Sequence, residues 1–263
     1  MRGTRITTVA VYERRIRASV ERIFENALDW ERLPGLHRDS FASVRRTDSG
    51  DWGWSAWVRG APGAREMALQ LVIDRAGRSY VIATIEGPGK GSEIHTSLVP
   101  KADDETQIRM EFRVPDVSPE RAAALGEAYR TLYARMWDED EAMMLRRARL
   151  QAVLRVPVPQ GRLELGPVTE LRSKLPQVVE WAGRPWRIVE LDGALVVHAG
   201  ICPHALGPLE TTPLEGSVVE CPWHRYRFDV RTGKSCDGRG LRLASAPRIE
   251  VAPDGRAQLV QAR

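Results

Sequence analysis

Two pairs of cysteine and histidine in the C-terminal half restrict the fold of this chain more than any other feature. Cys202 and His204 form a C-x-H motif, and Cys221 and His224 form a C-x-x-H motif, with residues 205–220 between them. Thiolate sulfur and imidazole nitrogen are ligands for zinc and for iron centres. Because these ligands are separated along the chain, a shared metal centre requires two loops that meet. We therefore expect two metal-binding loops in this half.

The motifs alone leave three interpretations open. Two Cys and two His satisfy the tetrahedral coordination of a structural zinc. Zinc fingers and ribbons, however, usually pair a cysteine with a cysteine and do not place Cys before His twice. The second interpretation has no metal, with two buried cysteines and two surface histidines. The third is an iron–sulfur centre with mixed ligands.

Residues 163–262 resemble a Rieske [2Fe-2S] domain, in which two histidines replace two cysteines on one iron. The resemblance implies that Cys202 and Cys221 bind one iron, and that His204 and His224 bind the other. The segment CPWHRYRFD is similar to the oxygenase and ferredoxin branches of this family. This sequence lacks the extra cysteine that the respiratory branch carries in each cluster loop, and Tyr226 and Phe228 stand where that branch has its hydroxyl donors, which implies a lower reduction potential. Arg225 stands where the family usually has glycine.

Composition restricts the class of protein and its partners. With 43% hydrophobic and 28% charged residues, the chain has the balance of a globular protein. Three cysteines in 263 residues are too few for a disulfide framework, which favours a reducing compartment. There is no signal-peptide pattern and no apolar run of the ~18 residues that span a bilayer, so we expect a cytoplasmic protein with no membrane span. The net charge of +4 comes with scattered arginines, so no nucleic acid is expected.

The N-terminal half has the pattern of a sheet that holds one long helix. The alternating segment TTVAVYERRIRA predicts a strand, and Ser19 caps a helix predicted over residues 20–32, ended by Pro34 and Gly35. Strand-like runs separated by turns such as DSG and DRAGR follow, and Ser118-Pro119 starts a long final helix. This order predicts a curved sheet gripping a helix, with a cavity between them.

The first half also resembles the START-like superfamily, over residues 5–153. The expected fold class is therefore an α+β helix-grip (START-like) domain followed by a small all-β Rieske domain. We expect the helix-grip domain with its ligand cavity at residues 1–153 and a proline-containing linker at 154–166. The Rieske domain is expected at residues 167–263.

The START-like superfamily includes the catalytic domains of Rieske oxygenases, which implies a second set of site residues. In those domains one helix carries an acid–Asn pair, an Asp and two His, and a later helix carries a carboxylate. The histidines and the carboxylate bind mononuclear Fe(II). The residues that fit this pattern are Glu25, Asn26, Asp29 and His37. Arg32 stands where the first His is expected, and an always-charged guanidinium is not an iron ligand.

Asp140 is the candidate carboxylate in this second site. It falls within the apolar stripe of the last helix, whereas Asp138 and Glu141 lie outside the stripe. A carboxylate on an apolar face needs a partner. That partner is an iron in one interpretation, and Arg32 or Arg147 in the other. The sequence thus predicts either a degenerate mononuclear iron site at His37 and Asp140 or a salt bridge in its place, and Asp29 is the candidate catalytic residue.

Three functions remain open. The first is a Rieske-type [2Fe-2S] oxidoreductase, related to the oxygenases, that passes electrons to a hydrophobic or aromatic substrate in the N-terminal cavity. The second is a Rieske electron carrier or redox sensor fused to a non-catalytic small-molecule-binding domain that lacks mononuclear iron. The third is a START-like cyclase or hydrolase with a regulatory cluster. We favour the first, with its oxygenase activity left open.

Several further residues carry expectations. The electron donor is expected to be a separate reductase or ferredoxin, because no dinucleotide-binding glycine fingerprint occurs; a homo-oligomer stays open. His95 is predicted to face solvent, His198 to be a satisfied strand histidine, and Cys236 to be a bystander. A strand rich in tryptophan either lines the cavity or packs the sheet on the helix, through Trp52, Trp54 and Trp57.

Overall fold

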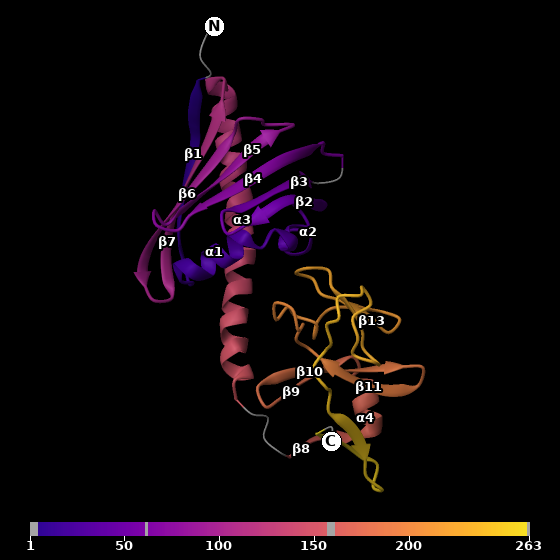
Figure 1. Cartoon of the computed structure of the whole chain (residues 1–263). Coiled ribbons are helices and arrows are strands. Elements are labelled where there is room, and N and C mark those ends of the chain that lie inside the picture. Colours follow the sequence, from indigo (N-terminus) through magenta and orange to yellow (C-terminus); the bar gives the residue numbers. More distant parts are fainter. Residues whose placement is uncertain (1–4, 61–62, 157–160, 262–263) are drawn as a thin grey trace. The chain divides into compact units, whose positions relative to one another are not determined.

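The computed structural model describes residues 5–60, 63–156 and 161–261, and the chain divides into two compact units, Met1–Leu145 and Arg146–Arg263 (Figure 1). The division falls within the longest helix. Residues 157–160 of the expected linker 154–166 lie outside the described residues, as do the first and last residues of the expected domains. Each unit is described separately below.

The N-terminal unit is built on one seven-stranded sheet with the order β1-β7-β6-β5-β4-β3-β2. All neighbouring strands are antiparallel. After β1 the chain leaves the sheet for short helices, returns at the opposite edge and then adds strands in sequence order back to β1. The strands are β1 (Ile6–Ile16), β2 (Ser43–Gly50), β3 (Gly53–Arg59), β4 (Glu66–Asp74), β5 (Ser79–Glu86), β6 (Glu93–Ala102) and β7 (Glu105–Pro115).

The first helix of this unit is shorter than the sequence predicts. The predicted helix over residues 20–32 ends early: α1 (Val20–Leu28) is followed by the 3-10 turn η1 (Trp30–Arg32) and the short α2 (Leu33–Leu36). The reason is the backbone of Asp29, whose ψ of 69° is not helical. Pro34 lies in the first turn of α2, where proline is tolerated, and does not end the helix. Ser19 caps α1 as expected, accepting a hydrogen bond from the Arg22 amide.

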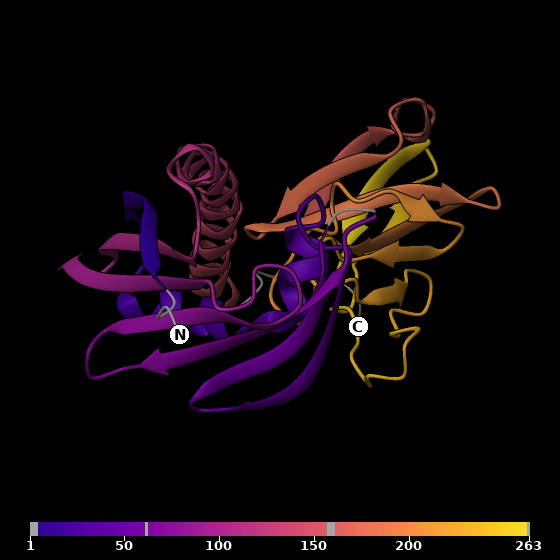
Figure 2. The same cartoon turned by 90° about the horizontal axis from the view of Figure 1, so that it is seen from above.

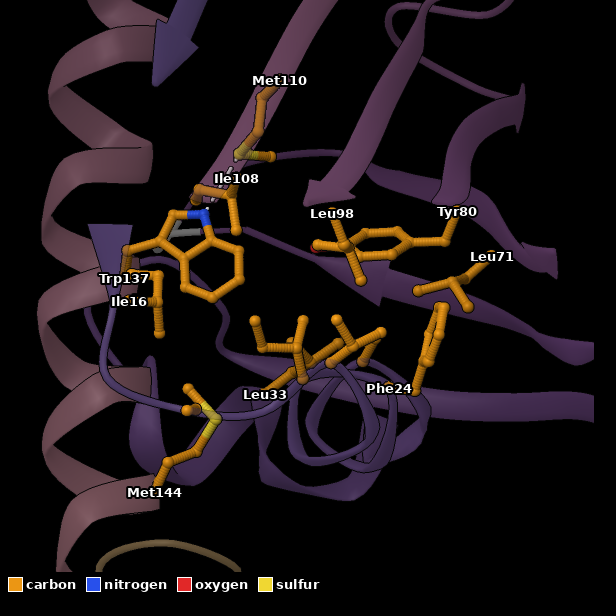
Figure 3. Packing of buried hydrophobic residues seen from close by; sticks show 14 of the residues in the cluster. Ile16, Phe24, Leu33, Leu71, Tyr80, Leu98, Ile108, Met110, Trp137 and Met144 are labelled. Carbon is orange, nitrogen blue, oxygen red and sulfur yellow. Dashed lines mark hydrogen bonds between the residues drawn. The ribbon is translucent and has the colours of Figure 1, made fainter. Parts of the chain in front are cut away.

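The long helix α3 (Pro119–Leu154) packs its first part on the sheet, as the helix-grip expectation requires. Figure 2 shows the sheet bending around this helix. Alternate residues of β7 are fully buried (Ile108, Met110 and Phe112), because strand side chains alternate between the faces of a sheet. In Figure 3, Ile108 and Met110 lie beside Trp137 of α3, whose indole Nε1 lies 3.1 Å from the sulfur of Met110. The core thus lies between sheet and helices, and the predicted fold class is confirmed.

The C-terminal unit consists of small antiparallel sheets, each with three strands: β11-β10-β9, β12-β13-β14 and β15-β16-β8. Strand β8 begins within the expected linker and pairs with β16, so the sheets of this unit start there. The elements are β8 (Arg162–Pro167), α4 (Val168–Ser173), β9 (Gln177–Trp181), β10 (Arg184–Leu191), β11 (Ala194–Ala199), β12 (Leu214–Glu215), β13 (Val218–Glu220), β14 (Arg227–Asp229), β15 (Arg248–Val251) and β16 (Arg256–Val260).

None of the described helices combines the length and the apolar character needed to cross a bilayer.

Candidate functional site

Two loops of the C-terminal unit carry the Cys and His motifs, and their backbones are built alike. In each loop the cysteine carbonyl accepts a hydrogen bond from the amide four residues later, that of Leu206 or of Arg225. The cysteine amide donates to the carbonyl five residues later, that of Gly207 or of Tyr226. Leu206 and Arg225 both have a left-handed backbone, with φ of 64° and 60°. This conformation explains why a glycine is usual at position 225.

The four motif side chains are brought together as expected. Cys202 and Cys221 are buried, and their side chains hydrogen-bond to each other. The rings of His204 and His224 lie edge to face, with centroids 4.4 Å apart. His204 is exposed, whereas His224 is buried like the two cysteines, so the site reaches the surface through His204.

The close approach of the loops depends on Gly207. A Cβ at this position would lie 2.5 Å from the sulfur of Cys221 and 3.3 Å from the Trp223 ring. Any side chain there would push the second loop away from the first. The glycine therefore allows a sulfur pair on one side of the site and an imidazole pair on the other.

The chemistry of this donor set fits a Rieske cluster. The hydrogen bond from Cys202 lowers the pKa of Cys221 to about 7 against the effect of burial, and the amides of Trp223 and His224 contribute. The same bond raises the pKa of Cys202, and burial adds to this. The Cys221 sulfur is thus the one that more readily carries a negative charge. Backbone amides of the same loop point at each of the two sulfurs. Cys202 and Cys221 would hold one iron and His204 and His224 the other, which supplies one-electron transfer.

Tyr226 and Arg239 form a stack beside His204 that the sequence analysis did not predict. Tyr226 stacks on His204 with centroids 4.4 Å apart and an interplanar angle of 22°. The guanidinium of Arg239 lies over the Tyr226 ring, 3.9 Å from the ring centroid. Arg239 Nη1 also donates to the Tyr226 hydroxyl at 2.8 Å. Asp237 holds Arg239 through its Nε at 3.1 Å. The exposed Arg239 is thereby linked through Tyr226 to His204, a candidate cluster ligand.

The first loop is also held from α3. Arg146 donates through Nε to the carbonyl of Leu206 at 2.9 Å and pairs with Glu210 at 2.6 and 2.9 Å. Both side chains of the pair are largely buried, at 16% and 13% exposure. The last part of α3 therefore fixes the loop of the C-terminal unit that carries Cys202 and His204.

In the N-terminal unit, Arg32 and Asp140 form a buried bidentate ion pair. Arg32 Nε and Nη2 donate to the two carboxylate oxygens at 3.0 and 3.1 Å, and Arg32 Nη1 donates to the Asp29 carbonyl at 2.8 Å. The side chains of the pair are only 7% and 8% exposed. Burial raises the pKa of Asp140, but the Arg32 charge and the hydrogen bond from His37 outweigh it and hold this pKa well below its usual range.

His37 lies beside this pair and contacts two carboxylates. Its Nδ1 lies 2.5 Å from Glu139, and its Nε2 lies 3.1 Å from Asp140. The sequence analysis did not single out Glu139. Its position directly before the candidate ligand Asp140 is the sequence feature that could have pointed to it. The structure joins the candidate ligands His37 and Asp140 to each other and to Arg32. Among the described residues, no group of three or more His, Cys, Asp or Glu is placed to hold a single metal ion.

A cavity of about 70 Å³ adjoins this network. Asn26 and Trp54 line it together with Arg32 and Asp140, and Trp54 also donates from Nε1 to the Ala27 carbonyl at 2.9 Å. Its volume is below the roughly 150 Å³ that accommodates benzene in a protein core. Trp52 and Trp57 do not line this cavity, so Trp54 alone of the three predicted tryptophans reaches it.

Other candidate residues lie away from the cavity. Glu25 pairs with Arg22 at 2.6 Å on the surface, and Asp29, the candidate catalytic residue, ends α1 outside the cavity lining. Glu141 is predicted to lie outside the apolar stripe of the last helix, but it is buried, because Arg14 and Arg17 cover it and pair with it. Arg14 lies in β1 and Arg17 directly follows this strand, so the end of β1 covers that face of α3.

The remaining histidines and the third cysteine are also placed. His95, predicted to face solvent, is half-buried with 31% of its side chain exposed, and its Nε2 lies 2.7 Å from Glu93. His198 is buried in β11, and its Nδ1 lies 3.0 Å from the Ala199 carbonyl. Cys236 is exposed.

Comparison with known proteins identifies the C-terminal unit. Residues 161–246 match the family described as Rieske [2Fe-2S] domain, so this unit contains a Rieske domain. The ferredoxin component of the p-cumate 2,3-dioxygenase system of Pseudomonas putida is 40% identical over 67 residues, which are 25% of this chain and 52% of that protein. The chain thus spans about half the length of this curated relative.

Solved structures are similar to parts of this chain. Norcoclaurine synthase from Thalictrum flavum aligns with 54% of this chain and 87% of its own, at 20% identity and a TM-score of 0.43. The ferredoxin of carbazole 1,9a-dioxygenase from Nocardioides aromaticivorans IC177 aligns with 39% of this chain and 100% of its own, at 21% identity and a TM-score of 0.33.

Proposed function

We propose that this chain is a Rieske-type electron-transfer protein whose N-terminal helix-grip unit binds a small molecule without mononuclear iron. The observation that carries the proposal is the contrast between the two sites. In the C-terminal unit, two buried sulfurs and two imidazoles meet on matched loops. In the N-terminal unit, a guanidinium occupies the contact with Asp140 that an iron would need.

The surface position of His204 suits electron exchange with a partner. Electron transfer requires close approach, and His204 is exposed whereas the cysteines are buried. The electron donor would be a separate reductase or ferredoxin. The ligand of the N-terminal unit would be largely apolar and smaller than a benzene ring, given the cavity volume of about 70 Å³ and its mostly apolar wall.

Iron counting tests the proposal. Protein purified without oxygen should contain two irons and two inorganic sulfides per chain, and show a Rieske-type spin-resonance signal after reduction. Zinc in place of iron would contradict the cluster. The iron content should stay at two in His37→Ala, because that histidine binds carboxylates.

A third iron per chain that is lost in His37→Ala would favour the oxygenase instead. Arg32→His offers a matched change, since it restores the residue type expected of an iron ligand. If the Arg32–Asp140 pair is what prevents iron binding, this variant should take up ferrous iron that the unaltered protein does not retain.

A further inference from the structure

A pocket of about 310 Å³ lies in the C-terminal unit, outside the cluster site. Its walls come from the end of β11, from the turn after β14 and from the segment 242–247. None of the four motif residues lines it, which are Cys202, His204, Cys221 and His224. The proposed electron transfer therefore leaves this pocket without a role.

Hydrogen bonds hold the walls of the pocket in place. The amide of Leu243 donates to the carbonyl of Gly233 at 2.8 Å, which joins the segment 242–247 to the turn. A Cβ added at Gly233 would lie 3.8 Å from the Nε of Arg242, so the Arg242 side chain lies over this turn. Since Gly233 and Arg242 both line the pocket, the Arg242 guanidinium stands at the pocket and is accessible, because Arg242 is exposed.

Cations and hydroxyl groups line the pocket without any acidic residue. Arg231 and Arg242 are joined there by Thr232 and Ser245, and the lining contains no Asp or Glu. Arg242 forms no ion pair and no side-chain hydrogen bond with any residue that the structure describes. Arg231 pairs through Nη2 with Asp192 at 2.5 Å, but the Asp192 side chain is 92% exposed, and an exposed pair contributes little.

A buried cation adds positive charge behind the wall. Arg187 of β10 is 8% exposed and lies opposite His198 of β11. Its guanidinium donates to the Thr212 carbonyl and has no acidic partner in the described part of the chain. Burial lowers the pKa of His198, and the Arg187 charge lowers it further, so this pocket-lining histidine is neutral at pH 7. Its Nε2 is buried in the wall, and the positive charge at the pocket therefore comes from the arginines.

A phosphate monoester fits this set of groups. It carries about −1.5 to −2 charge at pH 7 and three strong acceptor oxygens, whereas a carboxylate carries one charge and two oxygens. Guanidinium groups bind phosphate through parallel hydrogen bonds, and the Ser245 hydroxyl can donate to a further oxygen. We propose that this pocket binds a phosphorylated small molecule, with the phosphate on Arg242 and Ser245 and the organic part in the rest of the pocket.

Calorimetry of the full-length, cluster-containing protein with glycerol 3-phosphate tests the site. At low ionic strength, where charges are least screened, one molecule should bind per chain with a Kd of about 1 mM or tighter. Arg242→Gln should weaken this binding about tenfold, because it removes a charged donor. Arg256→Gln is the matched control: Arg256 is also an exposed arginine of this unit, but it lies outside the pocket lining, so the affinity should not change.

Three results would overturn the proposal. The first is no saturable binding of glycerol 3-phosphate, and the second is equal weakening in Arg242→Gln and Arg256→Gln, which would reveal attraction to the overall charge alone. The third is weakening in Arg225→Gln but not in Arg242→Gln, which would place the anion at the second cluster loop. Glycerate, a carboxylate of similar size, should bind more weakly, and equal affinity would reject phosphate as the recognised group. The visible absorbance of the cluster shows that each variant is folded in the unit under test.

Discussion

Removing one partner of the Arg32–Asp140 pair should destabilise the N-terminal unit strongly. Both side chains are more than nine-tenths buried and share two hydrogen bonds. Loss of one partner of a buried ion pair leaves an uncompensated charge and costs about 3–5 kcal/mol. In Arg32→Leu, the contact from His37 to Asp140 at 3.1 Å remains. We therefore expect the lower end of that range, about 3 kcal/mol.

The double variant Arg32→Leu/Asp140→Leu isolates the interaction. With both charges replaced by apolar groups, the cost of burying them also disappears, and such replacements are often neutral or stabilising. The double variant should therefore be more stable than either single variant, which gives a large coupling energy in a double-mutant cycle.

Urea unfolding followed by tryptophan fluorescence measures these free energies. The visible absorbance of the cluster, recorded in the same titration, reports the C-terminal unit, because two units need not unfold in one step. A loss below about 1 kcal/mol in Arg32→Leu would contradict the reasoning, since that is the cost of an exposed pair. Additive losses in the double variant would contradict it equally.

The other predictions concern the cluster loops and pH. Gly207→Ala should abolish cluster incorporation, measured as iron per chain, whereas Gly161→Ala, with open space around its Cβ position, should retain it. Arg225→Gly should raise the free energy of unfolding of the C-terminal unit by about 1 kcal/mol, because it relieves a left-handed backbone; an unchanged midpoint would refute this. Arg239→Gln should lower the reduction potential by roughly 20–40 mV, since it removes a stacked cation; voltammetry that shows no shift would count against the stack. The Asp140 pKa is lower in the folded state than its usual value of about 3.9, so its stabilisation is present above that value and is lost as pH falls below it. Asp140→Asn should flatten the loss of stability in acid-unfolding curves.

The sequence by itself determined the main strand and helix signals of the N-terminal unit and the cluster motif, but not the end of the first helix at Leu28. Alternating segments such as TTVAVYERRIRA became β1, and the Ser118-Pro119 signal marked the start of α3. Strand alternation and helix caps are local properties, so a single chain displays them. The Cys and His spacing is local as well, and residues 161–246 match a Rieske domain.

Tertiary structure decided what the sequence left open. The choice between an iron ligand and a salt bridge for Asp140 depends on a partner 108 residues away, brought into contact where η1 and α2 cross α3. The burial of Glu141, the contact of Glu139 with His37, and the stack of Arg239 on Tyr226 likewise join distant or differently oriented segments. Periodicity places a residue on a face of its own element. Which group meets that face depends on packing between elements, and this packing determines whether a buried charge is paired with a side chain or left for a metal.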